Sequence, residues 1–508
     1  MESSPTSIKA TSKKDENFDP VLSLETEFHV INSVRLPDQV SSSESSDISE
    51  ISKNKIKFQY RYWYTMFLTI NASLGTFFVG WSVGVFDPIQ KNLVCMFDWT
   101  EDEERIFFSL ISASLQFGAI IGAIVSGYIT KKLGRRKAYM LTNIISFIGT
   151  ALTLILNEYT MIAGRFTCGL CVGLYSTVSS VYVNEFVPYE ITGLCGTVYE
   201  MVYSGAIFFS YVAGFNLPEV GSPQNQWWRI MVLIPAVLNA VNMFMLLFVF
   251  KYETPKFLYL NQKNIDGAIR SLSTIYIRNE DVEIMMNDLS KLSDPKNSEI
   301  AIKDLFTKKY IIRLFTACAL MVGQQIGGAD VVFMYSDHIY QQIVDDPALV
   351  RTYTFYTGVS VIMAGITSMF IIEKFGRKKL FIIGETLVVL ILFTISAFYY
   401  FNMISTIIIY LFILFVFLNG VSIGPISYIY STDVLPENGV GIAVVFNYLA
   451  AFACTQSFLF FEKSFLKSSG TYGLYGCASF LILTIAVMFV KETRNKSVRE
   501  IDKLFDGK

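Results

Sequence analysis

The chain has 508 residues, of which 52% are hydrophobic and 17% are charged, and its mean hydropathy is +0.45. Soluble domains carry about a quarter charged residues, so this composition favours several membrane-spanning helices over one large soluble core. The formal net charge of -2 gives no electrostatic reason to expect a nucleic-acid partner.

Cysteine and histidine usage argues against an enzyme. The seven cysteines are too few and too scattered for a disulfide framework, and the two histidines form no arrangement typical of zinc binding or nucleophilic catalysis. Cys168 and Cys171 form a CxxC pair, but inside an apolar run such residues pack as small apolar side chains. We therefore expect no catalytic residue, no cofactor and no bound metal.

The N-terminal segment, residues 1–57, is polar and contains a serine run. It has little apolar surface to bury, and no early apolar stretch follows Met1 as a signal peptide would require. The sequence predicts a disordered cytosolic tail.

From residue 63 onward, apolar runs of about 20 residues recur, each long enough to cross the hydrocarbon core of a lipid bilayer as a helix. The chain is therefore predicted to be an all-α membrane protein with twelve transmembrane helices. These helices are predicted at residues 63–86, 106–129, 138–157, 160–183, 197–217, 228–250, 310–335, 353–373, 380–401, 405–430, 440–462 and 471–490.

Lysine and arginine in short loops set the orientation of such a chain. The loops "KKLGRRK" and "EKFGRKK" are basic, whereas "DWTEDEER" and "VDDP", on the other side, are acidic. The basic loops and both termini are thus predicted to be cytosolic, most simply at the plasma membrane. Residues 251–309 form a charged cytosolic linker predicted to contain short helices, and residues 491–508 form a cytosolic tail.

The sequence also repeats itself. "KKLGRRK" recurs as "EKFGRKK", "NEFVPYE" as "STDVLPE" and "YETPKF" as "KETRNK", in the same order and about 240 residues apart. Three ordered matches at nearly one offset indicate two homologous six-helix halves, residues 58–250 and 310–490, in parallel orientation. This architecture is typical of transporters that hold their substrate between the halves.

From about residue 63 to residue 501, the chain resembles the sugar porter branch of the major facilitator superfamily, close to the facilitative hexose transporters. The resemblance rests on a set of motifs that is specific when taken together: "GTFFVGWSVGVFDPIQ", the two basic loops, "AGRFTCGLCVG", "ETPKF", "QQIGGADVVFMYS", "GPIS" and "KETRNKSVREI". It implies a protein that carries a small sugar across a lipid bilayer; the sequence identifies no protein partner.

A polar stretch, "GQQIGGADVVFMYS", lies within the seventh predicted span, where polar side chains are costly and usually line a functional cavity. Glutamine and asparagine can both donate and accept hydrogen bonds, as replacing the water around a sugar requires. The simpler alternative is that these residues only hold helices together. The resemblance implies sugar contacts from Gln324, Gln325, Asp330, Asn447 and Tyr448.

Tyr335, Tyr428 and Tyr448 are further candidates, because flat rings stack on the C–H faces of sugars, although a tyrosine in a membrane protein often serves packing alone. Two positions depart from the family. Glu200 and Asp330 place carboxylic acids where the family has a glutamine and an asparagine. These acids could couple transport to protons, recognise a different substrate or simply accept hydrogen bonds.

The resemblance also implies a cytosolic gate in which charged side chains of the basic loops pair with acids at helix ends and lock the two halves together when the cavity faces outward. Exposed pairs contribute about 1 kcal/mol or less each, so such a gate acts through several pairs together. The matching residues are Arg135, Arg136, Arg165, Glu185, Glu253, Glu373, Arg377, Lys378 and Asp433.

The leading hypothesis is a hexose uniporter that works by alternating access. Proton-linked relatives carry an aspartate in the first span, facing an arginine of the fourth, whereas this chain has Ser82 at that position and keeps Arg165. One alternative is a proton-coupled sugar or polyol symporter that uses Glu200 or Asp330. The other is a nutrient receptor that keeps the fold but does not transport.

Overall fold

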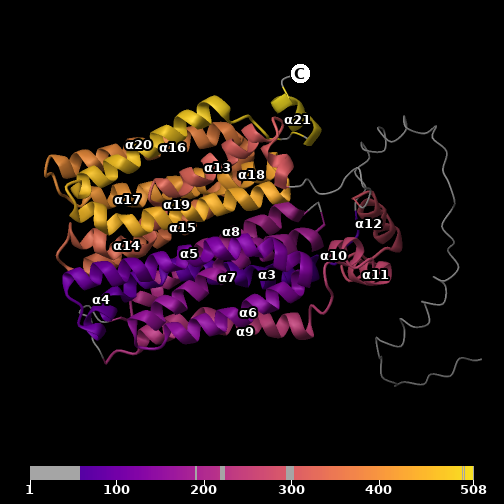
Figure 1. Ribbon diagram of the computed structural model, residues 1–508, viewed down its shortest axis with the longest axis horizontal. Coiled ribbons are helices and arrows are strands. Elements are labelled where there is room, and N and C mark those ends of the chain that lie inside the picture. The colour runs from indigo at the N-terminus through magenta and orange to yellow at the C-terminus, as the bar shows by residue number, and fades with distance from the viewer. Residues whose placement is uncertain are drawn as a thin grey trace, which may run out of the picture. The chain divides into compact units, whose positions relative to one another are not determined.

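The computed structural model describes residues 58–188, 191–217, 224–292, 302–494, 496 and 498–506. The predicted N-terminal tail lies outside these residues. The described part is built almost entirely from helices, which run alongside one another in two bundles (Figure 1).

The first bundle contains six long helices and one short helix, α4, that continues from α3 after a bend. Their bounds are α3 Tyr62–Gly84, α4 Phe86–Phe97, α5 Glu101–Leu133, α6 Arg135–Thr153, α7 Glu158–Phe186, α8 Thr192–Gly214 and α9 Trp227–Phe248.

The second bundle repeats this plan with two interrupted spans. The seventh span is divided into α13 and α14, and the tenth changes from α17 through a π-helical turn, η4, into α18. The bounds are α13 Ile311–Ile326, α14 Ala329–Gln341, α15 Pro347–Phe375, α16 Arg377–Tyr400, α17 Ile407–Leu418, η4 Asn419–Ile423, α18 Gly424–Val434, α19 Glu437–Lys463 and α20 Lys467–Phe489.

The twelve predicted spans are thus confirmed in the described residues, each within several residues of its expected ends. Ten of them are long and apolar enough to cross a membrane by length and composition alone. The other two are α6, which begins with three basic residues, and α8.

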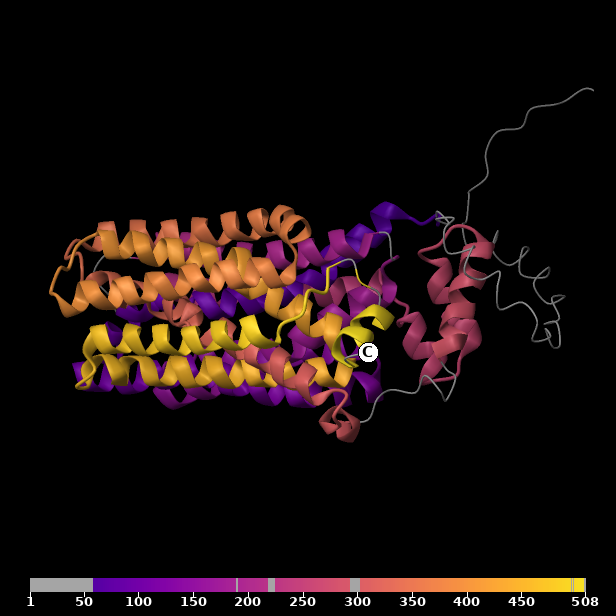
Figure 2. The same cartoon turned by 90° about the horizontal axis from the view of Figure 1, so that it is seen from above.

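Short helices lie between and after the bundles. The segment between α9 and α13 holds α10 Pro255–Leu260, α11 Ile265–Ser273, α12 Asn279–Leu292 and η3 Ile302–Phe306, and α21 Val498–Asp506 follows α20. Helices α10–α12 and α21 lie at one end of the bundles, here named the linker end (Figure 2). Helix α4 lies at the opposite end, here named the distal end.

Local sequence explains several helix starts at the distal end. Thr100 and Glu103 form a reciprocal capping box at the start of α5. The Asn157 side chain accepts hydrogen bonds from two backbone N–H groups at the start of α7, and Asp346 caps α15 just before Pro347. These caps satisfy N–H groups that the first turn of a helix leaves without partners.

The interruption in the seventh span follows from two adjacent glycines. Gly327 ends α13, and Gly328 has a φ of 87°, a left-handed conformation that glycine adopts without strain. A side-chain carbon at Gly328 would lie 3.1 Å from the ring of Tyr475. The break exposes polar groups in the middle of a span, and this is where the candidate site lies.

Gly328→Ala should lower the free energy of unfolding by about 1–2 kcal/mol, because alanine pays a steric cost in the left-handed region. Gly205→Ala is the matched control: Gly205 lies inside α8 with nothing within 4 Å of the position of an added side-chain carbon. Thermal unfolding of the purified proteins in detergent measures both effects. Equal transition temperatures for the two variants would contradict the assigned backbone conformation.

Candidate functional site

A cavity lies against the break in the seventh span and has walls from both bundles. Four of the predicted substrate residues line it: Gln324 and Gln325 from the end of α13, Asp330 from the first turn of α14, and Glu200 from α8. Its other walls come from α15 and from the π-helical turn at Asn419 and Gly420. The structure therefore brings together residues that are separated by up to 225 positions in the sequence, from Glu200 to Pro425.

The two glutamines are held by an asparagine of α19. Asn447 Nδ2 donates to Gln324 Oε1 at 2.9 Å and to the backbone oxygen of Met321 at 2.8 Å. Gln325 Nε2 in turn donates to Asn447 Oδ1 at 3.2 Å. Asn447 is almost completely buried, so it fixes the orientation of both amides from behind the cavity wall.

Asp330 is engaged by the opposite bundle. Gln116 Nε2 of α5 donates to Asp330 Oδ2 at 2.9 Å, and both side chains are buried. This hydrogen bond joins the first bundle to the second beside the cavity. Because a carboxylate accepts several hydrogen bonds, Asp330 keeps capacity for a further donor.

The three predicted tyrosines lie outside the residues that line this cavity. Tyr335 is fully buried, donates to the backbone oxygen of Thr455 at 3.3 Å and packs edge-on against Phe108. Tyr448 is hydrogen-bonded to Ser176 across the two bundles at 2.6 Å. Tyr428 lies in α18 and is half-buried.

Several cavity residues were not predicted from the sequence. Tyr203, Ser204, Phe333 and Asn419 line the cavity, and Gln116 reaches it through Asp330. Asn419 is the one with a sequence signal, since it is an amide within the very apolar run "IIIYLFILFVFLNG". Its Nδ2 is buried without a hydrogen-bond partner.

At the linker end, the first basic loop forms the expected ion pair. Arg135 donates to Glu185 Oε1 through Nη2 at 2.8 Å and through Nε at 3.2 Å. Gly134 turns the chain between α5 and α6 with a φ of 91°, and the Glu253 carboxylate accepts the backbone N–H of Arg136 at 2.9 Å. Burial raises the pKa of Glu253, and this hydrogen bond acts in the opposite direction.

The second basic loop has the same construction. Gly376 turns the chain with a φ of 82°, and the Glu492 carboxylate accepts the backbone N–H groups of Arg377 and Lys378 at 2.9 and 3.1 Å. Arg377 Nε lies 3.6 Å from Asp433 Oδ2. Glu253 and Glu492 thus occupy equivalent places at the N-termini of α6 and α16, as the sequence repeat predicts. A carboxylate there is favoured by the helix dipole.

Two residues predicted for the gate stand apart from these clusters. Arg165 lies in the second turn of α7, twenty residues before Glu185 on the same helix, which separates them by about 30 Å at 1.5 Å per residue. It is therefore not brought together with the charges of the linker end. The side chain of Glu373 lies outside the part that the structure describes.

The distal end has a contact between bundles that the sequence did not predict. The Asp87 carboxylate of α4 accepts hydrogen bonds from the Ser336 hydroxyl and, at 3.1 Å, from the backbone N–H of Asp337 in α14. Thr354 of α15 donates to Asp337 at 2.6 Å. Asp87 and Asp337 are buried, so this contact between the bundles is shielded from solvent.

These features define a class of protein. Two six-helix bundles of repeated construction enclose an amide-rich and carboxylate-containing cavity next to a broken helix, with contacts between bundles on its distal side. Such an arrangement is that of a membrane transporter with parallel repeats.

Comparison with known proteins supplies the family. A model described as sugar (and other) transporter matches residues 68–505. Hexose transporter 1 of Toxoplasma gondii is 25% identical and covers 87% of this chain and 82% of its own length. The facilitated trehalose transporter Tret1 of Bombyx mori is 27% identical and covers 88% of both chains.

Solved structures show the same fold. The proton:xylose symporter XylE, bound to 6-bromo-6-deoxy-D-glucose, has a TM-score of 0.74 and 20% identity, covering 88% of this chain and 100% of its own. A partially occluded, inward-open structure of the xylose transporter XylE from E. coli has a TM-score of 0.73 and 20% identity, covering 85% of this chain and 99% of its own. The chain belongs to the sugar (and other) transporter family, in the sugar porter branch of the major facilitator superfamily, and it is a multi-pass sugar transporter.

Asp87→Ala should open the distal end, because it removes the acceptor of both hydrogen bonds that join α4 to α14. Spin labels at Cys95 in α4 and at Leu349→Cys in α15 report the separation, in a chain whose other exposed cysteine carries Cys477→Ser. We expect the distance distribution to shift to longer values.

Asp102→Ala is the control, since the exposed Asp102 pairs at 2.9 Å with Arg105 of its own helix. Its distribution should match that of the unmodified chain. An unchanged distribution in Asp87→Ala would show that the distal contact does not hold the bundles together.

Proposed function

We propose that this transporter carries a monosaccharide, most simply a hexose, by alternating access and without coupling to an ion gradient. The observation that carries the proposal is the cluster of Gln324, Gln325 and Asn447 at the broken seventh span. Its amides are fixed by one another, so hydrogen bonds to a neutral, hydroxyl-rich ligand cost little further ordering. The hexose transporters among the relatives support a sugar of this kind, whereas the trehalose transporters among them are named for a disaccharide.

Proposed roles follow from the positions of the side chains. Gln324, Gln325, Asp330 and Glu200 contact the sugar from the cavity wall, and Asn447 orients the glutamines. The three predicted tyrosines, Tyr335, Tyr428 and Tyr448, are not among the residues that line the cavity. We propose that they take part in the conformational change around the sugar and not in its initial binding.

The charged clusters of the linker end serve as the cytosolic gate in this proposal. Arg135 with Glu185 and Arg377 with Asp433 each join helices of a single bundle, with Arg136, Lys378, Glu253 and Glu492 at the loop turns. They stiffen each bundle so that it moves as one body. The linker end and both termini are assigned to the cytosol, and the protein to the plasma membrane.

The same assignment divides the chain as the sequence suggests. Residues 58–250 and 310–490 form the two halves, residues 251–309 form the cytosolic linker, and residues 491–508 form a short tail.

Uptake by the purified protein in proteoliposomes tests the proposal directly. Radiolabelled glucose, fructose and inositol are compared, with empty liposomes as the control. We expect saturable uptake of a hexose that unlabelled hexose competes away. Saturable uptake of inositol alone would replace the hexose with a polyol, and uptake of none would remove the monosaccharide assignment.

Gln324→Ala should weaken sugar binding roughly 2- to 10-fold, the equivalent of one neutral hydrogen bond of about 0.5–1.5 kcal/mol. Gln342→Ala is the matched control, since Gln342 is exposed outside the cavity and donates to Glu462 at 2.8 Å. Equilibrium binding to the purified proteins measures both. Equal affinities would place the sugar away from Gln324.

Energy coupling is tested with an alkaline vesicle interior. We expect sugar to equilibrate without accumulating, because Ser82 replaces the acid that pairs with the span-four arginine in proton-linked relatives. The alternative is coupling through Glu200 or Asp330, both of which line the cavity. Glu200→Gln and Asp330→Asn distinguish the two possibilities. Accumulation above the external concentration that either substitution abolishes would establish a proton symporter.

A further inference from the structure

Arg165 carries a buried positive charge and is not among the residues that line the proposed sugar site. The residue is 2% exposed, in a span of α7 far from the charge clusters of the linker end. Buried charges are normally paired or extensively hydrogen-bonded, because removing them from water is costly. The groups that contact Arg165 therefore show how far its buried charge is stabilised.

The guanidinium group has partners on only part of its surface. Nη1 donates to the backbone oxygen of Ser82 at 2.9 Å, and the ring of Phe86 lies 4.0 Å from the guanidinium carbon. The Nε and Nη2 groups are buried without a hydrogen-bond partner. They form the edge that presents two parallel N–H groups to a single acceptor.

The same edge is occupied in another arginine of this protein. Arg135 directs its Nε and Nη2 groups at one carboxylate oxygen of Glu185. Arg165 offers identical donors but has no acid in front of them. Among the described residues that line the space around it, no aspartate or glutamate is present.

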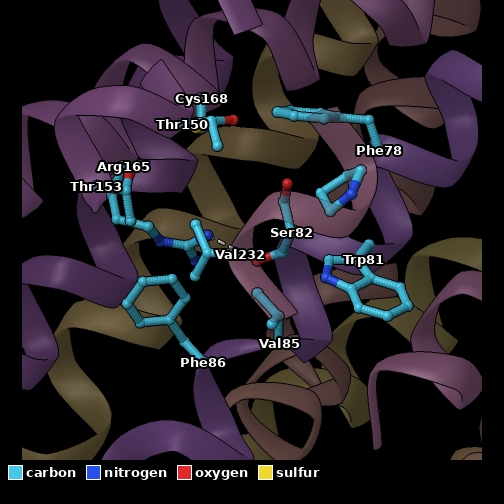
Figure 3. Close-up of a pocket in the computed structure, with 11 residues that line it drawn as sticks. Phe78, Trp81, Ser82, Val85, Phe86, Thr150, Thr153, Arg165, Cys168 and Val232 are labelled. Atoms are coloured by element: carbon cyan, nitrogen blue, oxygen red, sulfur yellow. Dashed lines mark hydrogen bonds between the residues drawn. The ribbon is translucent and has the colours of Figure 1, made fainter. Parts of the chain in front are cut away.

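Arg165 is one of the residues that line a small cavity. The guanidinium group points into it between the Phe86 ring and the segment from Ser82 to Val85 (Figure 3). The cavity has about 20 Å³ of free space, on the scale of a single water molecule or a monatomic ion. The rest of its wall is mainly apolar, with Phe78, Trp81, Val232 and Pro235 among its residues, and it also includes Thr150, Thr153 and Cys168.

We propose that this cavity binds a small monovalent anion of the halide class, with chloride as the test ligand. A halide accepts both free N–H groups, neutralises the single buried charge and tolerates an apolar wall. A phosphate or a carboxylic acid is too large for the space. This site goes beyond the proposed sugar transport, and its test does not depend on that activity.

The anion would connect three parts of the first bundle. Arg165 comes from α7, Ser82 and Phe86 lie on either side of the bend between α3 and α4, and Val232 belongs to α9. Occupancy therefore stabilises the bend that places Asp87 at the distal contact.

The test is thermal unfolding of the full-length purified protein in detergent, without sugar, in sodium chloride or sodium gluconate at fixed ionic strength and pH. Chloride should raise the unfolding temperature saturably, on the order of 2–4 °C at concentrations well above Kd. Bromide should act like chloride, whereas the larger gluconate should not.

Two substitutions at one position locate the effect. Ser82→Asp supplies a carboxylate on the cavity wall and should abolish the halide dependence. Ser82→Asn has nearly the same shape without the charge and should keep it. The same saturable dependence in Ser82→Asp as in the unmodified chain, or equal unfolding temperatures in the two salts for the unmodified chain, would overturn the site.

Crystals of the unmodified chain grown in bromide keep the proposal testable if Ser82→Asp does not fold. An anomalous scattering peak beside Nε and Nη2 of Arg165 is expected. A cavity that contains only water, or bromide bound only elsewhere, would refute the proposal.

Discussion

The hydrocarbon interior of a membrane offers no hydrogen-bond partners, so every backbone N–H and carbonyl group there must be satisfied within the protein. This constraint makes the spans helical and makes each interruption expensive. The chain interrupts its helices at the Gly327–Gly328 break and at the π-helical turn that begins at Asn419. Both interruptions face the same cavity. The polar side chains are therefore concentrated where the spans depart from a regular α-helix.

The two ends of the protein differ in whether their described contacts lie within one bundle or between the two bundles. Glu253 and Glu492 cap equivalent helices at the linker end, each within its own bundle. At the distal end and beside the cavity, the contacts of Asp87, Gln116 and Ser176 run from one bundle to the other. Contacts within a bundle hold each half as a unit, whereas contacts between bundles must be remade if the halves change position.

Much of this arrangement could be predicted from the sequence because it depends on local or periodic features. Span length and hydropathy identified the twelve helices, and the repeated motifs identified the two halves. The glutamines of "GQQIGG" located the cavity wall. The ion pairs of Arg135 and Arg377 were implied by the resemblance to the sugar porters.

The contacts that could not be predicted from the sequence join segments that lie far apart in the chain. Gln116 and Asp330 are 214 residues apart, and Asp87 and Ser336 are 249 residues apart, with no pattern in either segment that names the other. Tyr203 reaches the cavity only because α8 packs against α15. The absence of an acid opposite Arg165 was visible in the sequence, but the unpartnered edge of its guanidinium group was not.

The hydrogen bond from Gln116 to Asp330 has a consequence for selectivity. A sugar hydroxyl that binds the same carboxylate would share it with an amide donor supplied by the opposite bundle, so ligand binding and the link between the bundles meet at one group. A ligand that leaves Asp330 alone would bind without contacting the group that links the two bundles.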